Sequence, residues 1–280
     1  MIAHRRRPES PPRGSVFFFV TVSLVMAAMA VVPARAETTV PPKSRSVTVA
    51  VAANFLEPMR RIAAAYTETS GVGVRIVSGS TGGLYAKIRN GAPYDLFLAA
   101  DRATPHRLDS DGLAMPGTRF TYAVGRLALW TKSRALAATV GPEILRRGAF
   151  NHIALANPTL APYGAAAIQT LRALGLEQSL RSKFVRGQSI GQAYQFVATG
   201  SAPLGFVALS QLRRPNREPG GAWWLVPERL HDPIEQDAVA VAGRPNPAVS
   251  KAVLRFLRSD RGRAIIQTFG YGVAPTLVNQ

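Results

Sequence analysis

From Ser46 onward the sequence alternates short apolar strands with amphipathic helices, joined by turns rich in Gly, Ser and Asn. Residues 47–53 (VTVAVAA) predict a buried strand, and residues 57–69 predict a helix that ends before Gly71. The same pattern predicts strands at 72–76, 95–100, 126–130, 153–156, 184–186, 203–208 and 237–241, and helices from Leu84 and at 164–174, 190–198, 247–257 and 260–269. Such alternation is typical of an α/β fold with mostly parallel sheets and helices on both faces.

The length of the chain favours two lobes rather than one. About 240 residues of α/β pattern exceed what a single core usually holds. The apolar segment at 126–130 predicts a strand that opens a second unit, and 237–241 predicts a strand that leads back. We therefore expect a first lobe of residues 46–124 plus 240–280 and a second lobe of residues 125–239.

The first 36 residues have the features of an export signal. Basic residues at positions 4–7 precede an uncharged, mostly apolar run at 16–32, and Ala34 and Ala36 form a small-x-small cleavage site. The run has the minimum length for a membrane span, so a permanent anchor is the alternative. We expect cleavage near Ala36, a loose leader at 37–45, and a mature protein in the periplasm.

Composition excludes several function classes. The chain has no cysteine, which excludes disulfides, a thiolate nucleophile and a cysteine-ligated metal. Its formal net charge is +18, and removal of five basic residues and one acidic residue with the signal leaves +14. The basic residues are scattered and not interleaved with aromatic ones, so we predict no nucleic-acid partner. His106, His152 and His231 lie far apart in the sequence, so we predict neither a metal site nor an enzyme.

Four turns at predicted strand-to-helix junctions share an unusual composition. They are rich in small or hydroxyl residues and contain no basic residue, although the chain as a whole is basic. Ligands of α/β sheets bind outside the carboxyl ends of strands, where helix N-termini present unpaired N–H groups. These turns therefore predict a site of neutral donors for an anion. The four turns are 52–54 (AAN), 78–82 (SGSTG), 161–164 (APYG) and 188–191 (QSIG).

Each turn alone has a purely structural interpretation. Asn54, Ser80 and Thr81 are residue types that cap helices, while Tyr163 and Ile190 are typical core residues. The glycine-rich turn lacks the Gly-Lys-Ser/Thr of a P-loop, which argues against nucleotide binding. The hypothesis depends on finding four such turns in one chain.

Several segments resemble the molybdate-binding proteins of bacterial ABC importers, and the resemblance covers the whole mature chain. The most specific run is 91–101 (GAPYDLFLAAD), and the segments occur in the order that the family has. The others are 47–54 (VTVAVAAN), 78–84 (SGSTGGL), 156–158 (ANP) with 161–164 (APYG), and 202–210 (APLGFVALS). The resemblance implies a type II periplasmic-binding fold, with two α/β lobes, a hinge crossed twice and the oxyanion between the lobes.

The resemblance also implies which residues bind the ligand. Asn54 follows the first strand, Ser80 or Thr81 supplies a hydroxyl, and Tyr163 and Ile190 supply backbone N–H groups from the second lobe. Some members add a tyrosine hydroxyl at the position that is Ala208 here, so one donor is unaccounted for.

The expected function is capture of molybdate, and also of tungstate, for delivery to a membrane ABC permease, by a monomer that needs no cofactor. The alternative is the same fold binding another small anion such as sulfate or phosphate. A donor-only lining would reject a protonated oxyanion, whereas rejection of sulfate must depend on cavity size.

Overall fold

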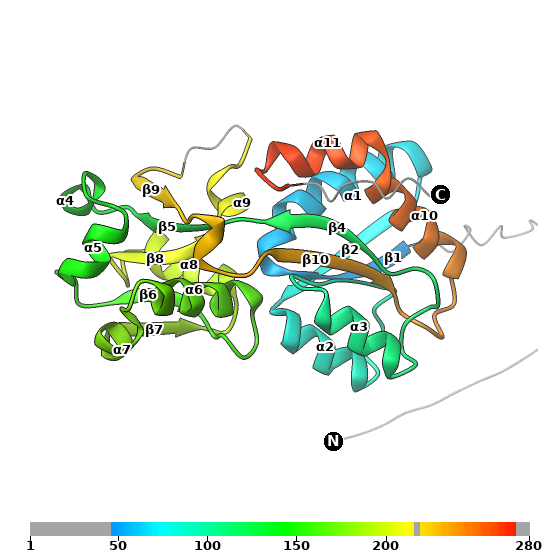
Figure 1. Cartoon of the computed structure of the whole chain (residues 1–280). Coiled ribbons are helices and arrows are strands. Elements are labelled where there is room, and N and C mark those ends of the chain that lie inside the picture. Colours follow the sequence, from blue (N-terminus) through cyan, green and yellow to red (C-terminus); the bar gives the residue numbers. More distant parts are fainter. Residues whose placement is uncertain (1–45, 216–218, 273–280) are drawn as a thin grey trace, which may run out of the picture. The chain divides into compact units, whose positions relative to one another are not determined.

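The computed structural model describes residues 46–215 and 219–272 and contains two five-stranded sheets (Figure 1). The predicted signal at 1–36 and leader at 37–45 lie outside the described residues. No helix in the described ranges has both the length and the apolar character that a bilayer span requires. We call the elements around the two sheets the first and the second lobe.

The first sheet has the strand order β2-β1-β3-β10-β4. β1 pairs in parallel with β2 and β3, whereas β10 runs antiparallel to both β3 and β4. Four strands therefore share one direction, as the βα pattern predicts, and β10 is the exception. The bounds are β1 Ser46–Ala52, β2 Gly73–Gly79, β3 Leu96–Leu98, β4 Phe120–Gly125 and β10 Ile234–Ala240.

Both faces of the first sheet are buried by helices. Along β1, Val47, Val49 and Val51 belong to one apolar cluster and Ala50 to another, because successive side chains alternate between faces. The first cluster lies under α1, α10 and α11, and the second under α2 and α3 (Figure 1). The bounds are α1 Leu56–Ser70, α2 Thr81–Arg89, α3 Ala103–Ser110, α10 Pro247–Arg258 and α11 Asp260–Thr268.

The second sheet repeats this arrangement, with the order β7-β6-β8-β5-β9 and one strand, β5, antiparallel to its neighbours. Its strands are β5 Leu127–Thr131, β6 Ile153–Ala156, β7 Phe184–Gly187, β8 Leu204–Ala208 and β9 Ala222–Leu225. Its helices are α4 Arg134–Ala137, α5 Pro142–Arg147, α6 Pro162–Ala173, α7 Glu177–Leu180, α8 Ile190–Ala198 and α9 Leu209–Leu212, and short 3-10 turns lie at η1 Ala53–Phe55, η2 Arg181–Lys183 and η3 Glu228–Leu230.

The chain passes twice between the sheets. It leaves the first sheet between β4 and β5, at Arg126, and returns just before β10 (Figure 1). The expected return strand, 237–241, overlaps β10, which is hydrogen-bonded in the first sheet from Ile234 onward and ends at Ala240. The first sheet thus includes residues 234–239, which the predicted range 240–280 omitted. These residues belong to it because β10 pairs with β4 from Ile234 to Ala238 and with β3 from Ala238 to Ala240. The lobe ranges themselves stay a prediction.

The predicted elements are all present, with ends shifted by a few residues. The helix predicted at 57–69 is α1, whose C-cap Gly71 has φ 68° and donates its N–H to the carbonyl of Thr67. The pattern missed β4, β9, α3 and the shorter helices, which have fewer residues or weaker apolar periodicity. The described chain is therefore the predicted α/β fold with two mixed sheets.

Candidate functional site

All five predicted site residues line one small cavity between the two lobes. Asn54, Ser80 and Thr81 come from the first lobe, and Tyr163 and Ile190 come from the second. Its lining is completed by Ala52, Ala53, Gly79, Ala100, Ala161 and Pro162, and the cavity volume is about 10 Å³. The structure thus brings together turns that are up to 136 positions apart in the sequence, from Asn54 to Ile190. That these residues bind a ligand stays a prediction.

Four helix N-termini from the two lobes reach this cavity. They belong to η1, α2, α6 and α8, which begin at Ala53, Thr81, Pro162 and Ile190. The first N–H groups of a helix have no acceptor within it and lie at the positive end of its dipole. Several N–H groups of this kind next to one space favour a negatively charged ligand.

On the second lobe, backbone geometry selects which N–H groups are available. Pro162 is the first residue of α6 and has no N–H, so Tyr163 carries the first one. The N–H of Gly164 already donates to the carbonyl of Ala161 (2.8 Å). In α8, the Ser189 hydroxyl accepts from the N–H of Gln192, and Ile190 is the first helical residue. Among the residues that line the cavity, Tyr163 and Ile190 are therefore the ones that carry the first N–H of these two helices.

The two hydroxyls of the first-lobe turn have different partners. The Oγ1 of Thr81 is buried and accepts a hydrogen bond from the N–H of Ala100 (2.9 Å), which ties α2 to the end of β3. Ser80 is the N-cap residue of α2, but its side chain makes no capping hydrogen bond. Accepting from Ala100 leaves the Thr81 hydroxyl its own proton, and the Ser80 hydroxyl makes no cap, so both hydroxyls are able to donate to a ligand.

Asn54 is not a helix cap but lies inside η1, with 2% of its surface exposed. Its Nδ2 donates to Oε1 of Gln236 (2.8 Å) and to the hydroxyl of Tyr271 (2.9 Å). Its backbone carbonyl accepts from Ser210 Oγ (2.8 Å) and from the Tyr271 hydroxyl (2.9 Å). Asn54 therefore contacts the cavity and is also the centre of a buried polar network.

This network joins the two lobes directly behind the cavity. Gln236 of β10 donates from Nε2 to the hydroxyl of Tyr163 in α6 (3.1 Å), and its Oε1 accepts from the hydroxyl of Tyr122 (3.0 Å). The Tyr271 hydroxyl also contacts Ser210 Oγ (3.0 Å). We call this buried polar network the hinge network; its six residues are Asn54, Tyr122, Tyr163, Ser210, Gln236 and Tyr271.

The three tyrosines of the hinge network stay protonated. Burial, reinforced by the neighbouring tyrosines, raises the pKa of Tyr122 and of Tyr163 well above the ordinary value. Burial also raises the pKa of Tyr271, against hydrogen bonds from Ser210, Asn54 and Tyr163 that lower it. Each hydroxyl therefore keeps a proton to donate at neutral pH, and the network adds no negative charge beside the cavity.

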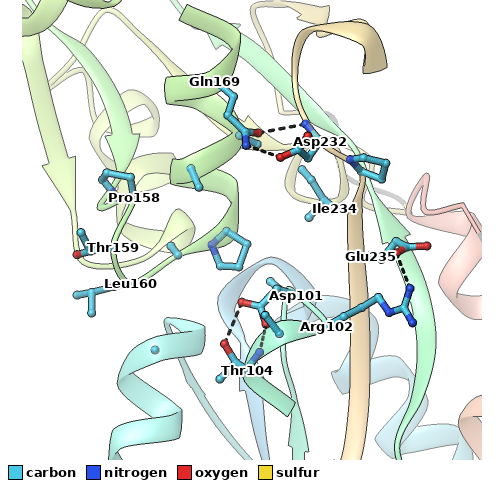
Figure 2. Close-up of a pocket in the computed structure, with 18 residues that line it drawn as sticks. Asp101, Arg102, Thr104, Pro158, Thr159, Leu160, Gln169, Asp232, Ile234 and Glu235 are labelled. Atoms are coloured by element: carbon cyan, nitrogen blue, oxygen red, sulfur yellow. Dashed lines mark hydrogen bonds and ion pairs between the residues drawn. The ribbon is translucent and has the colours of Figure 1, made fainter. Parts of the chain in front are cut away.

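The cavity is neutral, in contrast to a larger cleft that adjoins it. Among the described residues that line the cavity, none is Lys, Arg, His, Asp or Glu. The larger cleft has a volume of about 390 Å³, and its lining includes Asp101, Arg102, Asp232 and Glu235 (Figure 2).

In the larger cleft, Arg102 pairs with Glu235 (3.0 Å), and Gln169 donates to the carboxylate of Asp232 (2.6 Å) (Figure 2). The carboxylate of Asp101 accepts from the N–H and hydroxyl of Thr104, but burial raises its pKa above the ordinary value. Three carboxylates disfavour an anion there, so the small cavity is the candidate anion site.

Two glycines allow the lobes to touch at the cavity. The N–H of Gly82 in α2 donates to the carbonyl of Leu160 (3.0 Å), across the lobes. A Cβ on Gly191 in α8 would come within 3.2 Å of the Cβ of Ala53, which is tighter than ordinary contact. Each glycine lies in the first turn of a helix that reaches the cavity, so the absence of a side chain lets opposing helix N-termini approach.

The sequence patterns did not reveal the hinge network. Gln236, Tyr271, Tyr122 and Ser210 lie on different elements and carry no local motif. One available signal was Gln236 itself, a neutral polar residue in a strand whose residues are almost all buried. Ala208, where some members of the family have a tyrosine, ends β8 and is fully buried, so its methyl group adds no donor.

Two α/β lobes, a double crossing and a neutral cavity between helix N-termini define an extracellular solute-binding protein. The chain belongs to the bacterial extracellular solute-binding protein family, whose model matches residues 47–272. Proteins of this family are non-enzymatic components of transport systems, in agreement with the prediction that the chain is not an enzyme.

The chain is also similar to named relatives. It is 47% identical to the molybdate-binding protein ModA of Azotobacter vinelandii, over 82% of this chain and 91% of that protein. It is 43% identical to ModA of Rhodobacter capsulatus, over 82% of this chain and 90% of that protein. The solved periplasmic molybdate-binding protein of A. vinelandii superposes with a TM-score of 0.79 at 38% identity, over 82% of this chain and all of that one. These comparisons confirm the family resemblance and the predicted fold.

Proposed function

We propose that the mature protein captures molybdate outside the cytoplasm and delivers it to a membrane ABC permease. The observation that carries the proposal is the neutral cavity, which takes N–H and hydroxyl donors from both lobes and no charged side chain. Similarity to two molybdate-binding proteins over more than four-fifths of the chain supports molybdate as the ligand.

The physical basis is hydrogen bonding by fixed dipoles. Molybdate is a dianion with four equivalent oxygens, and loss of its hydration must be offset by several short, charge-assisted hydrogen bonds. The proposed donors are the N–H groups of Tyr163 and Ile190, the Ser80 hydroxyl, the first-turn N–H of Thr81, and Asn54. They come from both lobes, so full coordination requires closure of the lobes. A permease that recognises the closed form would then distinguish loaded from empty protein.

Tungstate belongs to the same proposal because its ion has the same charge, shape and oxygen arrangement. Sulfate has the same charge and is smaller, so it would make fewer simultaneous hydrogen bonds in a cradle sized for molybdate. The solved sulfate-binding protein SubI of Mycobacterium tuberculosis has the same fold with a TM-score of 0.69, but its identity of 14% supports the fold alone.

Export is the remaining part of the proposal. The basic start, the apolar run and the Ala34–Ala36 site support cleavage near Ala36 and release of a monomer into the periplasm. Mass measurement of protein recovered from the periplasmic fraction should give a chain that begins at Glu37. A mass that retains residues 1–36 would contradict cleavage and favour a membrane anchor.

Isothermal titration of the mature protein tests the ligand. We expect tight binding of molybdate that persists in millimolar sulfate, and competition by tungstate. The bound metal in protein purified without added oxyanion should be molybdenum or tungsten by elemental mass spectrometry. Equal affinity for sulfate and molybdate, or no binding of either, would overturn the proposal.

A further inference from the structure

Two buried side-chain amides, those of Asn54 and Gln236, form one continuous hydrogen-bonded pair beside the cavity. Gln236 is fully buried, and its amide contacts Asn54 (2.8 Å), Tyr122 (3.0 Å) and Tyr163 (3.1 Å). Both ends of the Gln236 amide are therefore occupied. It touches one cavity residue in the first lobe, Asn54, and another in the second lobe, Tyr163.

The amide of Asn54 is occupied at one end only. Its Nδ2 is held by Gln236 and Tyr271, whereas its Oδ1 is buried and accepts no hydrogen bond from any described residue. A buried carbonyl without a donor is destabilising. Because Asn54 lines the cavity and its other polar atom is engaged, the Oδ1 end is the end available to a ligand. In this arrangement it would oppose an oxyanion, since oxygen would face oxygen.

Both amides can also be turned over by 180°, with the loss of the hydrogen bond from the Tyr271 hydroxyl to the Asn54 carbonyl (2.9 Å), because a hydroxyl has only one proton. Gln236 Nε2 would then donate to Asn54 Oδ1 and to the Tyr122 hydroxyl, which itself donates to the carbonyl of Ala99 (2.9 Å). The Tyr163 hydroxyl would donate to Gln236 Oε1, and the Tyr271 hydroxyl to Asn54 Oδ1. Both amides can turn because the hydroxyls of Tyr122, Tyr163 and Tyr271 can each donate or accept a hydrogen bond. After the turn, Asn54 Nδ2 lies where Oδ1 was and faces the ligand.

We propose that Gln236 is a positioning residue that turns together with Asn54, so that a bound dianion meets the Nδ2 donor of Asn54. The proposal rests on the proposed function, because the ligand must be an oxyanion without a proton. Turning one amide alone would place two nitrogens or two oxygens against each other at 2.8 Å, so the pair turns as a unit. Gln236 thereby decides whether Asn54 presents a donor or an acceptor.

This arrangement also bears on selectivity. A deprotonated dianion selects the donor orientation, whereas a ligand that carries an O–H could use the acceptor orientation. The turned state gives Asn54 Oδ1 two donors but takes the Tyr271 proton away from the Asn54 carbonyl, so the hydrogen bonds to a bound dianion must offset that loss. Discrimination then comes from how firmly Gln236 holds the donor orientation, and that depends on its bonds to Tyr122 and Tyr163.

Nuclear magnetic resonance of the 15N-labelled mature protein tests the proposal directly. The side-chain amide signal of Asn54, assigned by its loss in Asn54→Ser, is followed during titration with sodium molybdate. We expect its two Nδ2 protons to shift downfield and become protected from exchange at saturation, and the Gln236 amide signal to change at the same ligand concentrations. An Asn54 signal that stays unchanged in saturated protein would overturn the proposal.

Variants separate positioning from a merely structural role. Gln236→Met keeps the side-chain volume and removes both hydrogen-bonding ends, and we expect molybdate affinity to fall roughly tenfold or more, through faster dissociation. Gln211→Met is the matched control, because Gln211 is a buried glutamine whose amide contacts Ala208 and Ile190 but not Asn54.

The control is expected to keep the Asn54 signal response to molybdate, whereas Gln236→Met loses it. An unchanged affinity and response in Gln236→Met would overturn the proposal. If Gln236→Met does not fold, the measurement on the unmodified protein decides. Failure of the unmodified protein to bind molybdate at all would instead overturn the proposed function.

Discussion

At the scale of single residues, the cavity depends on which polar atoms the fold leaves free. Thr81 and Ser80 are neighbours with the same chemical group, yet the Thr81 oxygen accepts from Ala100 and the Ser80 hydroxyl makes no cap. Sequence alone could not choose between them, because both are residue types that cap helices. In the folded structure the Thr81 oxygen also holds Ala100 in place, whereas the Ser80 hydroxyl has no cap to make, and each of the two hydroxyls keeps a proton for a ligand.

Ser80→Ala is predicted to weaken molybdate binding by about tenfold, since a hydrogen bond to a charged group contributes about 1.5–3 kcal/mol. Thermal stability without ligand should change little, because the hydroxyl caps nothing. Ser259→Ala is the matched control: Ser259 caps α11 by accepting from Gly262, so its loss should cost about 1 kcal/mol of stability and no affinity. Calorimetric titration and thermal unfolding measure the two effects, and a stability loss without an affinity loss at Ser80 would contradict the assignment.

The raised pKa of Asp101 predicts that folding stability depends on pH. Burial raises its pKa, so the folded state binds the proton more tightly than the unfolded chain does. Folding stability from this group is therefore present at low pH and is lost as pH rises through the folded pKa.

Asp101→Asn removes this titration while keeping a side-chain oxygen that can accept from Thr104. The unfolding free energy of the original protein relative to the variant should be larger at pH 4 than at pH 7. Urea denaturation at both pH values measures it, and a difference that shrinks at pH 4 would contradict the prediction.

At the scale of elements, helix N-termini from two lobes converge because small residues separate them. Gly191 and Ala53 are in close contact, and Gly82 donates to Leu160 across the lobes. A larger side chain at such a point would hold the lobes apart even if every donor remained. Element packing therefore controls how many donors reach one ligand at the same time.

Gly191→Ala is predicted to separate stability from binding. Alanine in a helix is favoured over glycine by about 0.5–1 kcal/mol, so the protein without ligand should be as stable as before or more so. The new methyl group would meet Ala53 at 3.2 Å, so closure and molybdate affinity should decrease several-fold. Gly73→Ala is the control, because its nearest contact, at 3.8 Å, is ordinary and lies far from the cavity lining. Equal affinity for all three proteins would contradict a role in closure.

At the scale of the whole molecule, the protein is strongly basic while its cavity is neutral. The net charge of the chain is +18, and +14 with the proposed signal at residues 1–36 left out, and it comes from residues outside the cavity lining. A distributed positive charge attracts anions over long distances and is screened by salt, whereas the hydrogen bonds of a closed cavity are screened much less. The overall charge should therefore affect how fast the ligand arrives rather than how long it stays.

Stopped-flow binding at increasing ionic strength tests this division. The association rate constant for molybdate is predicted to fall several-fold from about 10 mM to about 500 mM salt, where the Debye length shortens from about 30 Å to less than 10 Å. The dissociation rate constant should change little. A salt effect confined to dissociation would indicate charged side chains in contact with the ion and would contradict the neutral cradle.

The local patterns of the sequence predicted most elements and the composition of the cradle. β1, α1, α6 and α8 follow from apolar periodicity together with turn and cap residues, which are local properties. The hinge network could not be predicted, because Asn54 and Gln236 are 182 positions apart and meet only through the pairing of β10 within the first sheet.

What the sequence by itself determined is the chemistry available: apolar strands, helix starts, and four turns without a charged side chain. Only the tertiary structure decided which polar atoms remain free for a ligand, because each hydrogen-bonding group can be used by the fold or by the ligand. The Nδ2 of Asn54 donates within the protein, and the Thr81 oxygen accepts there while keeping its proton. The Ser80 hydroxyl and the first N–H groups of α6 and α8 are not engaged by the local cap and turn contacts. That allocation depends on long-range packing, which no local pattern of residues encodes.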